Sequence, residues 1–598
     1  MFTPEGQLAD KIDKIMLLAL WVKALRKERA QIKDSLQKLQ TIITVGMGQP
    51  TYPISVHTID FFLAYWKHLE ELVKGALNNL DEMKEAAAID YGHPQGDEEA
   101  RVLMADAMTA WYKKNIKPEH ILFTTGGAGG LRVVFEALHE RYKDIPLHRV
   151  ITPFPHYGLY GDYQKHRLHP IDVMKEPGFR LTAEALEKSI IEAYELAKID
   201  GGTPKAVLIC NPSNPLGTVI SEAEFQKIAD VLRKYPDLHL IFDEAYTEMT
   251  YVDVPSFLQI APDLQRRTVI MRSATKGLSM AGERMAMLLA FDPKLMNELL
   301  AININISGHA PRSLQMAYAH TMSNITENEK KDLKNFYKEK VDYVTNRLKK
   351  MGAEISDPDY NVEGTFYVLA DFSDMFGLEI PEEAIRALGK RGQITTDEEL
   401  TYYLLFQDSI MIAPLSYYGV SEKAGLMRIT CSKNLKELEE LMDRLESRLL
   451  EARQVRKTEL LTSIDQQLQR INDPAIYAEI NSKLNQVINK TGDCLNYKSQ
   501  LQELNSIHNL VKTLLSESSE SNIFPEEREK ERLLSPRFFS NGEVSCIKKQ
   551  VEKEWEEFLD KTFGKEGTVR KMMAGLSEDE RLEIVPWREY LASRPALA

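Results

Sequence analysis

Two spacings of hydrophobic residues divide the first 450 positions into predicted strands and helices. Short apolar runs bounded by polar turn residues predict buried strands, and apolar residues that recur every three or four positions predict helices between them. Strands that alternate with helices in this way form a mostly parallel sheet covered on both faces. The large α/β domain that we predict over residues 61–345 contains strands at 120–123, 149–152, 206–210, 239–242, 268–271 and 285–291.

Further segments with the same two spacings predict smaller parts around this domain. Residues 346–454 hold apolar segments between helices, and together with residues 41–60 they form a predicted small α/β domain. Residues 7–40 have helical spacing without Pro or Gly, which predicts an N-terminal helical arm over residues 1–40. We expect this arm to pack on the protein or on a partner subunit. Binding of the arm to a membrane surface is the alternative interpretation.

The chain becomes polar and helical beyond residue 455. Residues 456–515 predict helices, the serine- and glutamate-rich segment 516–522 predicts a flexible linker, and residues 545–598 predict further helix. This part contains no recognisable catalytic pattern. We therefore expect residues 455–598 to form a helical extension that serves packing, oligomer contacts or a protein partner.

Composition narrows the classes of protein to which the chain can belong. A net charge of −14 over 598 residues provides no general attraction to nucleic acid. The four cysteines, Cys210, Cys431, Cys494 and Cys546, have no metal-ligand spacing and predict no disulfide framework. The apolar run at 15–22 is too short to span a bilayer. We expect a cytoplasmic protein without a metal, nucleic acid or membrane partner. Export by a route that leaves no signal in the sequence is the alternative that stays open.

Lys276 is the first candidate for chemistry. It lies in a connector rich in Ser, Thr and Gly between the buried strands 268–271 and 285–291. Desolvation disfavours an ammonium, so a lysine held there loses its proton readily and becomes a nucleophile for carbonyls. The carbonyl that such lysines most often meet is the aldehyde of pyridoxal phosphate, and Arg284 offers a fork for its phosphate. For this stretch alone, a surface lysine in a loop is the simpler interpretation.

Other polar motifs also follow predicted strands. The glycine-rich turn 124–130 leads into a helix, and the free N–H groups and dipole at a helix start favour a phosphate. The turn lacks the pattern of a Walker A loop or a dinucleotide fingerprint, so it implies neither ATP nor NAD. Tyr157, Asn214 and Asp243 each stand at the end of a strand, where ligands bind in sheets of this class.

These motifs, in this order, resemble the class I and II aminotransferases, which are fold-type I pyridoxal phosphate enzymes related to aspartate aminotransferase. The resemblance covers about residues 40–450. It implies pyridoxal 5'-phosphate as cofactor, an amino acid and a 2-oxo acid as substrates, and a homodimer with shared active sites in amino-acid metabolism and biosynthesis. The motifs are Y-x-x-x-x-G at 91–96, T-x-G-A at 125–128, P-x-Y at 155–157, N-P-L-G at 214–217, D-E-A-Y at 243–246, S-A-T-K at 273–276 and M-R-I at 427–429.

The resemblance also implies roles for individual residues. Lys276 would form a Schiff base with the cofactor and carry the proton, and Asp243 would bind the pyridine nitrogen. Tyr246 would complete the catalytic set as a partner of the ring hydroxyl. The remaining residues would bind the cofactor (Gly127, Ala128, Gly129, Tyr157, Asn214, Ser273 and Arg284, with Tyr91 from the neighbouring subunit) or the substrate (Gly48, Asn214 and Arg428).

Some positions depart from the family pattern and leave the substrate open. Thr275 stands where serine is usual, and Glu283 and Ala286 replace a common aromatic residue and a frequent glycine. Residues 301–311 contain no arginine for a second carboxylate. Three interpretations follow: an aminotransferase, another pyridoxal phosphate enzyme such as a lyase or decarboxylase, or a binding or regulatory protein that works through its C-terminal extension.

Overall fold

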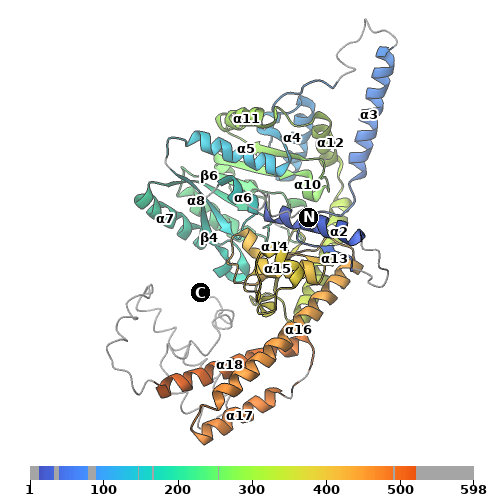
Figure 1. Cartoon of the computed structure of the whole chain (residues 1–598). Helices are drawn as coiled ribbons and strands as arrows, with labels where there is room; N and C mark the ends of the chain where they lie inside the picture. The colour runs from blue at the N-terminus through green and yellow to red at the C-terminus, as the bar shows by residue number, and fades with distance from the viewer. Residues whose placement is uncertain are drawn as a thin grey trace. The chain divides into compact units, whose positions relative to one another are not determined.

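The computed structural model describes residues 13–31, 40–77, 89–145, 147–164, 167–253, 255–488, 490 and 492–519 (Figure 1). The chain divides into two compact units. The first runs to residue 348 and includes 357–444, and the second comprises 349–356 and the described residues from 445 onwards. The predicted boundary between a large and a small α/β domain is therefore not a boundary between these units, and it stays a prediction.

A seven-stranded sheet in the order β2-β8-β7-β6-β5-β3-β4 forms the centre of the first unit. The strands from β7 to β4 are parallel, whereas β8 is antiparallel to both of its neighbours. This arrangement confirms the predicted mostly parallel sheet. The strands are β2 Ile121–Thr125, β3 His148–Phe154, β4 Leu168–Asp172, β5 Thr203–Cys210, β6 His239–Asp243, β7 Thr268–Ser273 and β8 Met285–Ala290.

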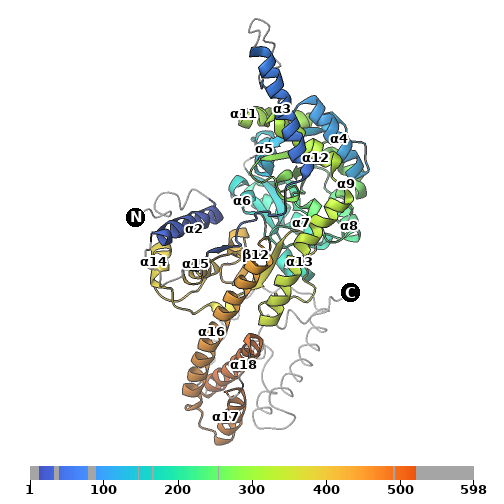
Figure 2. The ribbon, with the colours of Figure 1, turned by 90° about the vertical axis from the view of Figure 1, so that its right-hand side faces the viewer.

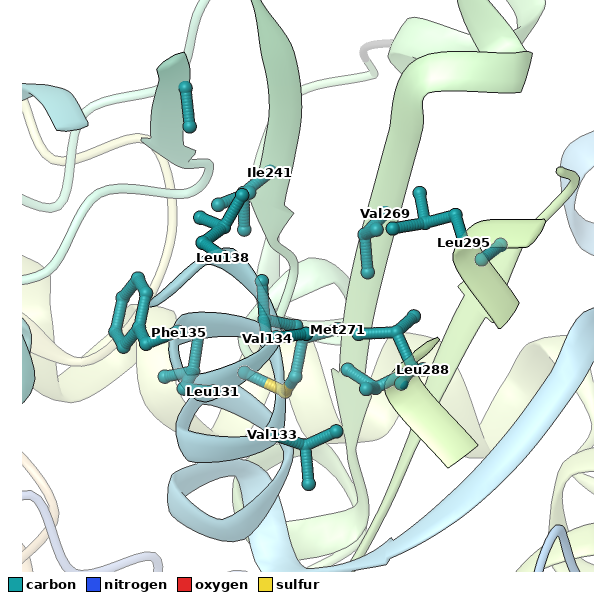
Figure 3. Packing of buried hydrophobic residues seen from close by; sticks show 14 of the residues in the cluster. Leu131, Val133, Val134, Phe135, Leu138, Ile241, Val269, Met271, Leu288 and Leu295 are labelled. Carbon is teal, nitrogen blue, oxygen red and sulfur yellow. The ribbon is translucent and has the colours of Figure 1, made fainter. Parts of the chain in front are cut away.

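Helices cover this sheet, and one of them fixes the position of the glycine-rich turn. The apolar face of α5, which includes Val134 and Leu138, packs against Ile241 of β6 and Met271 of β7 (Figure 3). This packing anchors the first turn of α5 at the carboxyl end of the neighbouring strands. The helices of this part are α3 Val56–Leu77, α4 Glu98–Tyr112, α5 Gly126–Arg141, α6 Gly158–Gln164, α7 Ala183–Asp200, α8 Glu222–Arg233, α9 Phe257–Ile260, α10 Ala274–Gly277, α11 Pro293–Ser307 and α12 Arg312–Asn324.

Two smaller sheets complete the first unit. In one, β12 (Leu426–Thr430) lies antiparallel between β9 (Tyr367–Asp371) and β11 (Ala413–Pro414). In the other, β1 (Ile43–Thr44) pairs parallel with β10 (Ile410–Met411). The accompanying helices are α13 Glu327–Met351, α14 Glu382–Leu388 and α15 Asp397–Gln407.

The N-terminal arm contains a shorter helix than the hydrophobic spacing predicts. Helix α2 spans Lys14–Ala30, and residues 1–12 and 32–39 lie outside the described residues. Its apolar face is buried, with Trp21 1% exposed and in edge contact with Phe406 of α15 at 5.5 Å. A face that already packs on the protein is not free for a membrane surface, so the packing interpretation of this helix is confirmed.

The second unit is helical. It contains the part of α16 (Leu435–Leu468) from residue 445, together with α17 (Pro474–Ile488) and α18 (Cys494–Ser519), around a shared apolar core. The linker expected at 516–522 is wrong for residues 516–519, which continue α18. These residues include neither Gly nor Pro, which would end the helix. Extending an existing helix also needs no new nucleation. Residues 520–598, with Cys546 and the helix expected at 545–598, lie outside the described residues.

Among the described residues, no helix combines the length and the hydrophobicity needed to cross a membrane. The same part of the chain contains no cluster of three or more His, Cys, Asp or Glu side chains arranged to hold a metal ion.

Candidate active site

Lys276 lies on α10, the single helical turn that follows β7. Ser273 caps this turn, because its hydroxyl accepts a hydrogen bond from the Thr275 N–H at 3.1 Å. The departure to threonine at 275 is accommodated, since its hydroxyl in turn accepts from Ser273 at 2.6 Å. The Lys276 ammonium donates to the Gly48 carbonyl.

The surroundings of Lys276 favour its neutral form. Burial, and then the positive charges of Arg428 and Arg284, lower the pKa of Lys276 to about 7, while Asp243 acts in the opposite direction. A lysine with this pKa is partly an uncharged amine at neutral pH. It can therefore act as a nucleophile and as a proton donor or acceptor without a large pH change.

We expect the pH dependence of cofactor attachment to report this shift. The amine is protonated and unreactive below its pKa, so the rate of pyridoxal phosphate attachment to the cofactor-free protein should rise about tenfold from pH 6 to pH 8 and then level off. An ordinary lysine, with a pKa of about 10.4, would give a rate that rises about 100-fold over the same interval and continues upward. Stopped-flow absorbance of the attached cofactor measures this rate, and a continuing rise through pH 9 would contradict a lowered pKa.

Asp243 is the last residue of β6, next to β7 in the sheet. Side chains alternate along a strand, so Asp243 shares a face with Ile241, the face that packs on α5. One carboxylate oxygen accepts from the Tyr160 hydroxyl at 2.6 Å and the other from the Ala245 N–H at 3.1 Å. Burial raises the pKa of Asp243, and these two hydrogen bonds and Lys276 oppose that rise.

Arg428 on β12 lies in a cage of polar and aromatic groups. Its two terminal nitrogens donate to the Asn214 side-chain oxygen at 2.8 Å and to the Gly46 carbonyl at 2.6 Å. The guanidinium lies 4.1 Å from the ring centre of Tyr367 and 4.7 Å from that of Tyr418. Its Nε is buried and has no hydrogen-bond partner among the described residues, so a donor of this buried cation is available to an anion.

Tyr246 and Gly48 connect Arg428 to Lys276. The Tyr246 hydroxyl lies 2.8 Å from the Tyr367 hydroxyl and accepts a hydrogen bond from the Asn214 side chain at 3.4 Å. A β-carbon on Gly48 would lie 2.1 Å from the Tyr367 hydroxyl and 3.2 Å from the Lys276 amine. Only glycine fits at this position. These contacts bring five predicted residues together in one cluster: Gly48, Asn214, Tyr246, Lys276 and Arg428.

The first turn of α5 forms a second part of the same site. It carries Gly127, Ala128 and Gly129 at the N-terminus of the helix, where backbone N–H groups and the positive end of the helix dipole favour an anion. A β-carbon on Gly127 would lie 3.5 Å from that of Ser273, and one on Gly126 would lie 2.8 Å from the Arg284 guanidinium. The N-terminus of a helix, a hydroxyl and a guanidinium around space that only glycines leave open are the donor set for a phosphate. The residues present therefore fit pyridoxal phosphate.

The two remaining predicted residues lie in different surroundings. Tyr157, between β3 and α6, is half-buried and its ring meets that of Tyr160 edge-on at 5.6 Å, which places it beside the Asp243 cluster. Tyr91 is 89% exposed, and its ring contacts His309 at 6.0 Å. Within the described part of the chain, no hydrogen bond or ring contact joins Tyr91 to the other predicted site residues, so its role in a neighbouring subunit stays a prediction.

Three tyrosines of the site are absent from the sequence-based prediction. Tyr160 follows Tyr157 by three positions, a spacing that places both on one side of a helical turn and that could have indicated it. Tyr367 and Tyr418 lie in apolar segments without a local signal. They come next to Arg428 only because β12, which carries Arg428, pairs with β9, which carries Tyr367, and with β11, which Tyr418 follows.

Comparison with known proteins adds independent evidence for the family to which the chain belongs. Residues 67–445 match the family model described as aminotransferase class I and II, and residues beyond 445 lie outside the match. A probable aspartate/prephenate aminotransferase from Rickettsia felis is 28% identical over 379 residues, which are 61% of this chain and 85% of the relative. An aspartate aminotransferase from Pyrococcus horikoshii is 22% identical over 71% of this chain and 95% of its own length.

Solved structures show the same fold. The aspartate aminotransferase from Rhizobium meliloti superposes with a TM-score of 0.55 at 21% identity, covering 74% of this chain and 97% of that one. A putative kynurenine aminotransferase from Saccharomyces cerevisiae gives a TM-score of 0.57 at 19% identity, covering 74% and 98%.

Proposed function

The chain belongs to the class I and II aminotransferases, which depend on pyridoxal phosphate, and on that premise we propose that it moves the amino group of an L-amino acid to a 2-oxo acid with the cofactor attached to Lys276. The observation that carries this proposal is the convergence of three groups from two different sheets in one site. Lys276, Asp243 and Arg428 supply an amine with a lowered pKa, a buried carboxylate and a buried guanidinium.

When bound, pyridoxal phosphate supplies an aldehyde that condenses with amines and a ring that draws electrons from the substrate α-carbon. The donors around the first turn of α5 would hold its phosphate, with Ser273 and Arg284. Asp243 would supply a negative charge for the ring nitrogen, because Tyr160 and the Ala245 N–H stabilise the carboxylate. Asn214 and Tyr246 would bind the ring hydroxyl, and Tyr157 would stack on the ring.

Lys276 and Arg428 act on the substrate. Two of the five N–H groups of Arg428 are used by Asn214 and Gly46, and the others bind the substrate α-carboxylate, which orients the α-carbon toward Lys276. The Lys276 amine would take the proton from that carbon, hold it as an ammonium and pass it to the cofactor carbon that receives the amino group. A pKa of about 7 suits both directions of transfer at neutral pH.

The amino donor that we propose has no second carboxylate. Several relatives are named as aspartate aminotransferases, but residues 301–311 of this chain hold no arginine. The next residue, Arg312, is paired with Asp97 at 2.7 Å. Within the described residues 301–312 no unpaired cation stands ready for a side-chain carboxylate, which disfavours aspartate because that charge would lose its hydration without compensation.

We also propose the domain organisation, the oligomeric state, the location and the metabolic role of the protein. These assignments comprise a large domain over 61–345, a small domain over 41–60 and 346–454, a homodimer in which Tyr91 serves the neighbouring site, a cytoplasmic location, and a role in amino-acid metabolism and biosynthesis. The extension from residue 455 is an accessory to the catalytic part, and its partner is another protein or a second copy of this chain.

The test is a single-donor experiment on the cofactor-loaded protein. With a neutral L-amino acid and no 2-oxo acid, we expect the cofactor to become pyridoxamine phosphate, seen as loss of its visible absorbance, and a 2-oxo acid should restore the absorbance. Aspartate should react about tenfold more slowly or worse, since its second carboxylate has no partner. Release of ammonia or carbon dioxide with the absorbance retained would instead show a lyase or a decarboxylase.

A further inference from the structure

The face of the large sheet opposite α5 carries a buried ion pair that the proposed chemistry does not use. Arg272 is on β7, and because side chains alternate along a strand, it points away from Met271 and α5. Its guanidinium donates to the carboxylate of Glu248, which lies on the short helix η6 (Thr247–Met249). The two side chains are 0% and 3% exposed. Two opposite charges are therefore held together in the core of the first unit.

Helices α4 and α12, which lie side by side in both views, surround the arginine of this pair (Figures 1 and 2). The guanidinium lies 4.3 Å from the ring centre of Trp111 and donates to the hydroxyl of Tyr112 at 3.3 Å, both on α4. That hydroxyl donates in turn to Glu244 at 2.6 Å. Burial raises the pKa of Tyr318 on α12, and the positive charge of Arg272 opposes the rise. A planar guanidinium with these partners has a fixed orientation.

The carboxylate of Glu248 lies directly against the turn that carries Lys276. A β-carbon on Gly277 would lie 2.7 Å from both the β-carbon and Oε2 of Glu248, so only glycine fits beside Lys276. This Oε2 and the Nε of Arg272 are buried without a hydrogen-bond partner among the described residues. Unpaired polar atoms cost stability, and a buried ion pair is often no more stabilising than apolar side chains of similar volume. Stability alone therefore does not explain this pair.

We propose that Arg272 and Glu248 are positioning residues that fix the turn of Lys276 relative to the loop after β6. Helix η6 directly follows Tyr246, and Arg272 directly precedes Ser273, the N-cap of α10. The ion pair therefore joins the segment that carries Tyr246 to the segment that carries Lys276. Supporting contacts of this kind hold a reactive group within about 0.5 Å of its working position. This inference rests on the proposed function, because it concerns the amine to which that function assigns the cofactor.

The first experiment separates positioning from stability. R272M and E248Q each leave one buried charge uncompensated and should lower the midpoint of thermal unfolding, whereas R272M/E248Q removes both charges and should recover most of it. We expect kcat of the double variant with a neutral donor to stay about 100-fold below that of the wild type, with KM changed less than about threefold. A small displacement of a reacting group is sufficient for such a loss. A double variant that recovers kcat together with its stability would overturn the proposal.

A second measurement reports the surroundings of Lys276 without cofactor or substrate. Acetic anhydride acetylates the uncharged amine, so mass spectrometry of residue 276 after acetylation of the cofactor-free protein at a series of pH values gives its pKa. Burial is the main cause of the low pKa of Lys276. Arg428 and Arg284 lower it further, and Asp243 opposes them. A loosened turn admits water to the amine, so the midpoint in the double variant should rise by about one pH unit.

The acetylation midpoint keeps the two proposals separate. The single-donor experiment can fail while the midpoint still rises in the double variant, and amino transfer can proceed while the midpoint stays unchanged. An unchanged midpoint in R272M/E248Q would overturn the positioning role of the pair and leave the proposed function intact.

Gly277 offers a variant that keeps both charges of the pair. G277A places a methyl group against Glu248 and should displace the turn, lowering kcat about tenfold or more and raising the acetylation midpoint. The matched control is G282A in the same connector, where a β-carbon meets no described residue within 4 Å apart from its chain neighbours, and kcat should change less than about twofold. Neither glycine has a positive φ. Wild-type kcat and an unchanged midpoint in G277A would overturn the proposal.

Discussion

Replacing Lys276 with alanine is expected to lower the turnover of the best amino donor by about 10⁴-fold or more. In the proposed function the substitution removes both the amine that attaches the cofactor and the group that moves the proton, and each such group contributes a large factor to catalysis. Initial rates of amino transfer measure the loss. After reduction with borohydride, mass spectrometry should find the cofactor joined to residue 276 in the wild type and no covalent cofactor in K276A.

Lys340 provides a matched control for this experiment. It is a second buried lysine, 6% exposed on α13, and burial lowers its pKa to about 8. Its ammonium lies 3.2 Å from the ring centre of Phe336, and its role in the structure is packing. K340M should keep the borohydride-stable cofactor at residue 276. Normal turnover in K276A, or labelling at Lys340 in place of Lys276, would show that the amine is assigned to the wrong residue.

Replacing Asp243 with alanine is expected to lower kcat by about 10²–10³-fold and to change KM much less. In the proposed function the carboxylate stabilises positive charge on the ring nitrogen, and this electrostatic contribution matters most when charge develops at the substrate carbon. Steady-state rates with a neutral donor separate kcat from KM. A variant that loses affinity but keeps its kcat would contradict the role of an electronic anchor.

Tyr160→Phe is the graded comparison for Asp243→Ala. It removes one of the two hydrogen bonds to the carboxylate and keeps the carboxylate itself. A hydrogen bond to a charged group contributes about 1.5–3 kcal/mol, so a kcat loss of about 10- to 100-fold is expected, no larger than that of Asp243→Ala. A larger loss in Tyr160→Phe than in Asp243→Ala would mean that Tyr160 acts other than through Asp243.

Local sequence was sufficient for six of the seven strands of the large sheet and for the residues at their ends, whereas β4 was not predicted. A strand buried on both faces needs an uninterrupted apolar run, so β7 and β8 were visible as such runs, and the connector between them identified Lys276. Glycines next to a strand end similarly indicated the first turn of α5. The direction of β8 was not visible in this way, because antiparallel pairing depends on how the short connector folds back.

What the sequence by itself determined was the order of strands and helices, the family motifs and the chemical types of the groups at the sheet edge, since each depends on neighbours within a few residues. Only the tertiary structure decided that Tyr160 supports Asp243, that Tyr367 and Tyr418 enclose Arg428, and that Arg272 and Glu248 pair beside the turn of Lys276. These features join residues from different elements that are far apart in the sequence. Packing of whole elements creates them, and no local pattern of residue types encodes that packing.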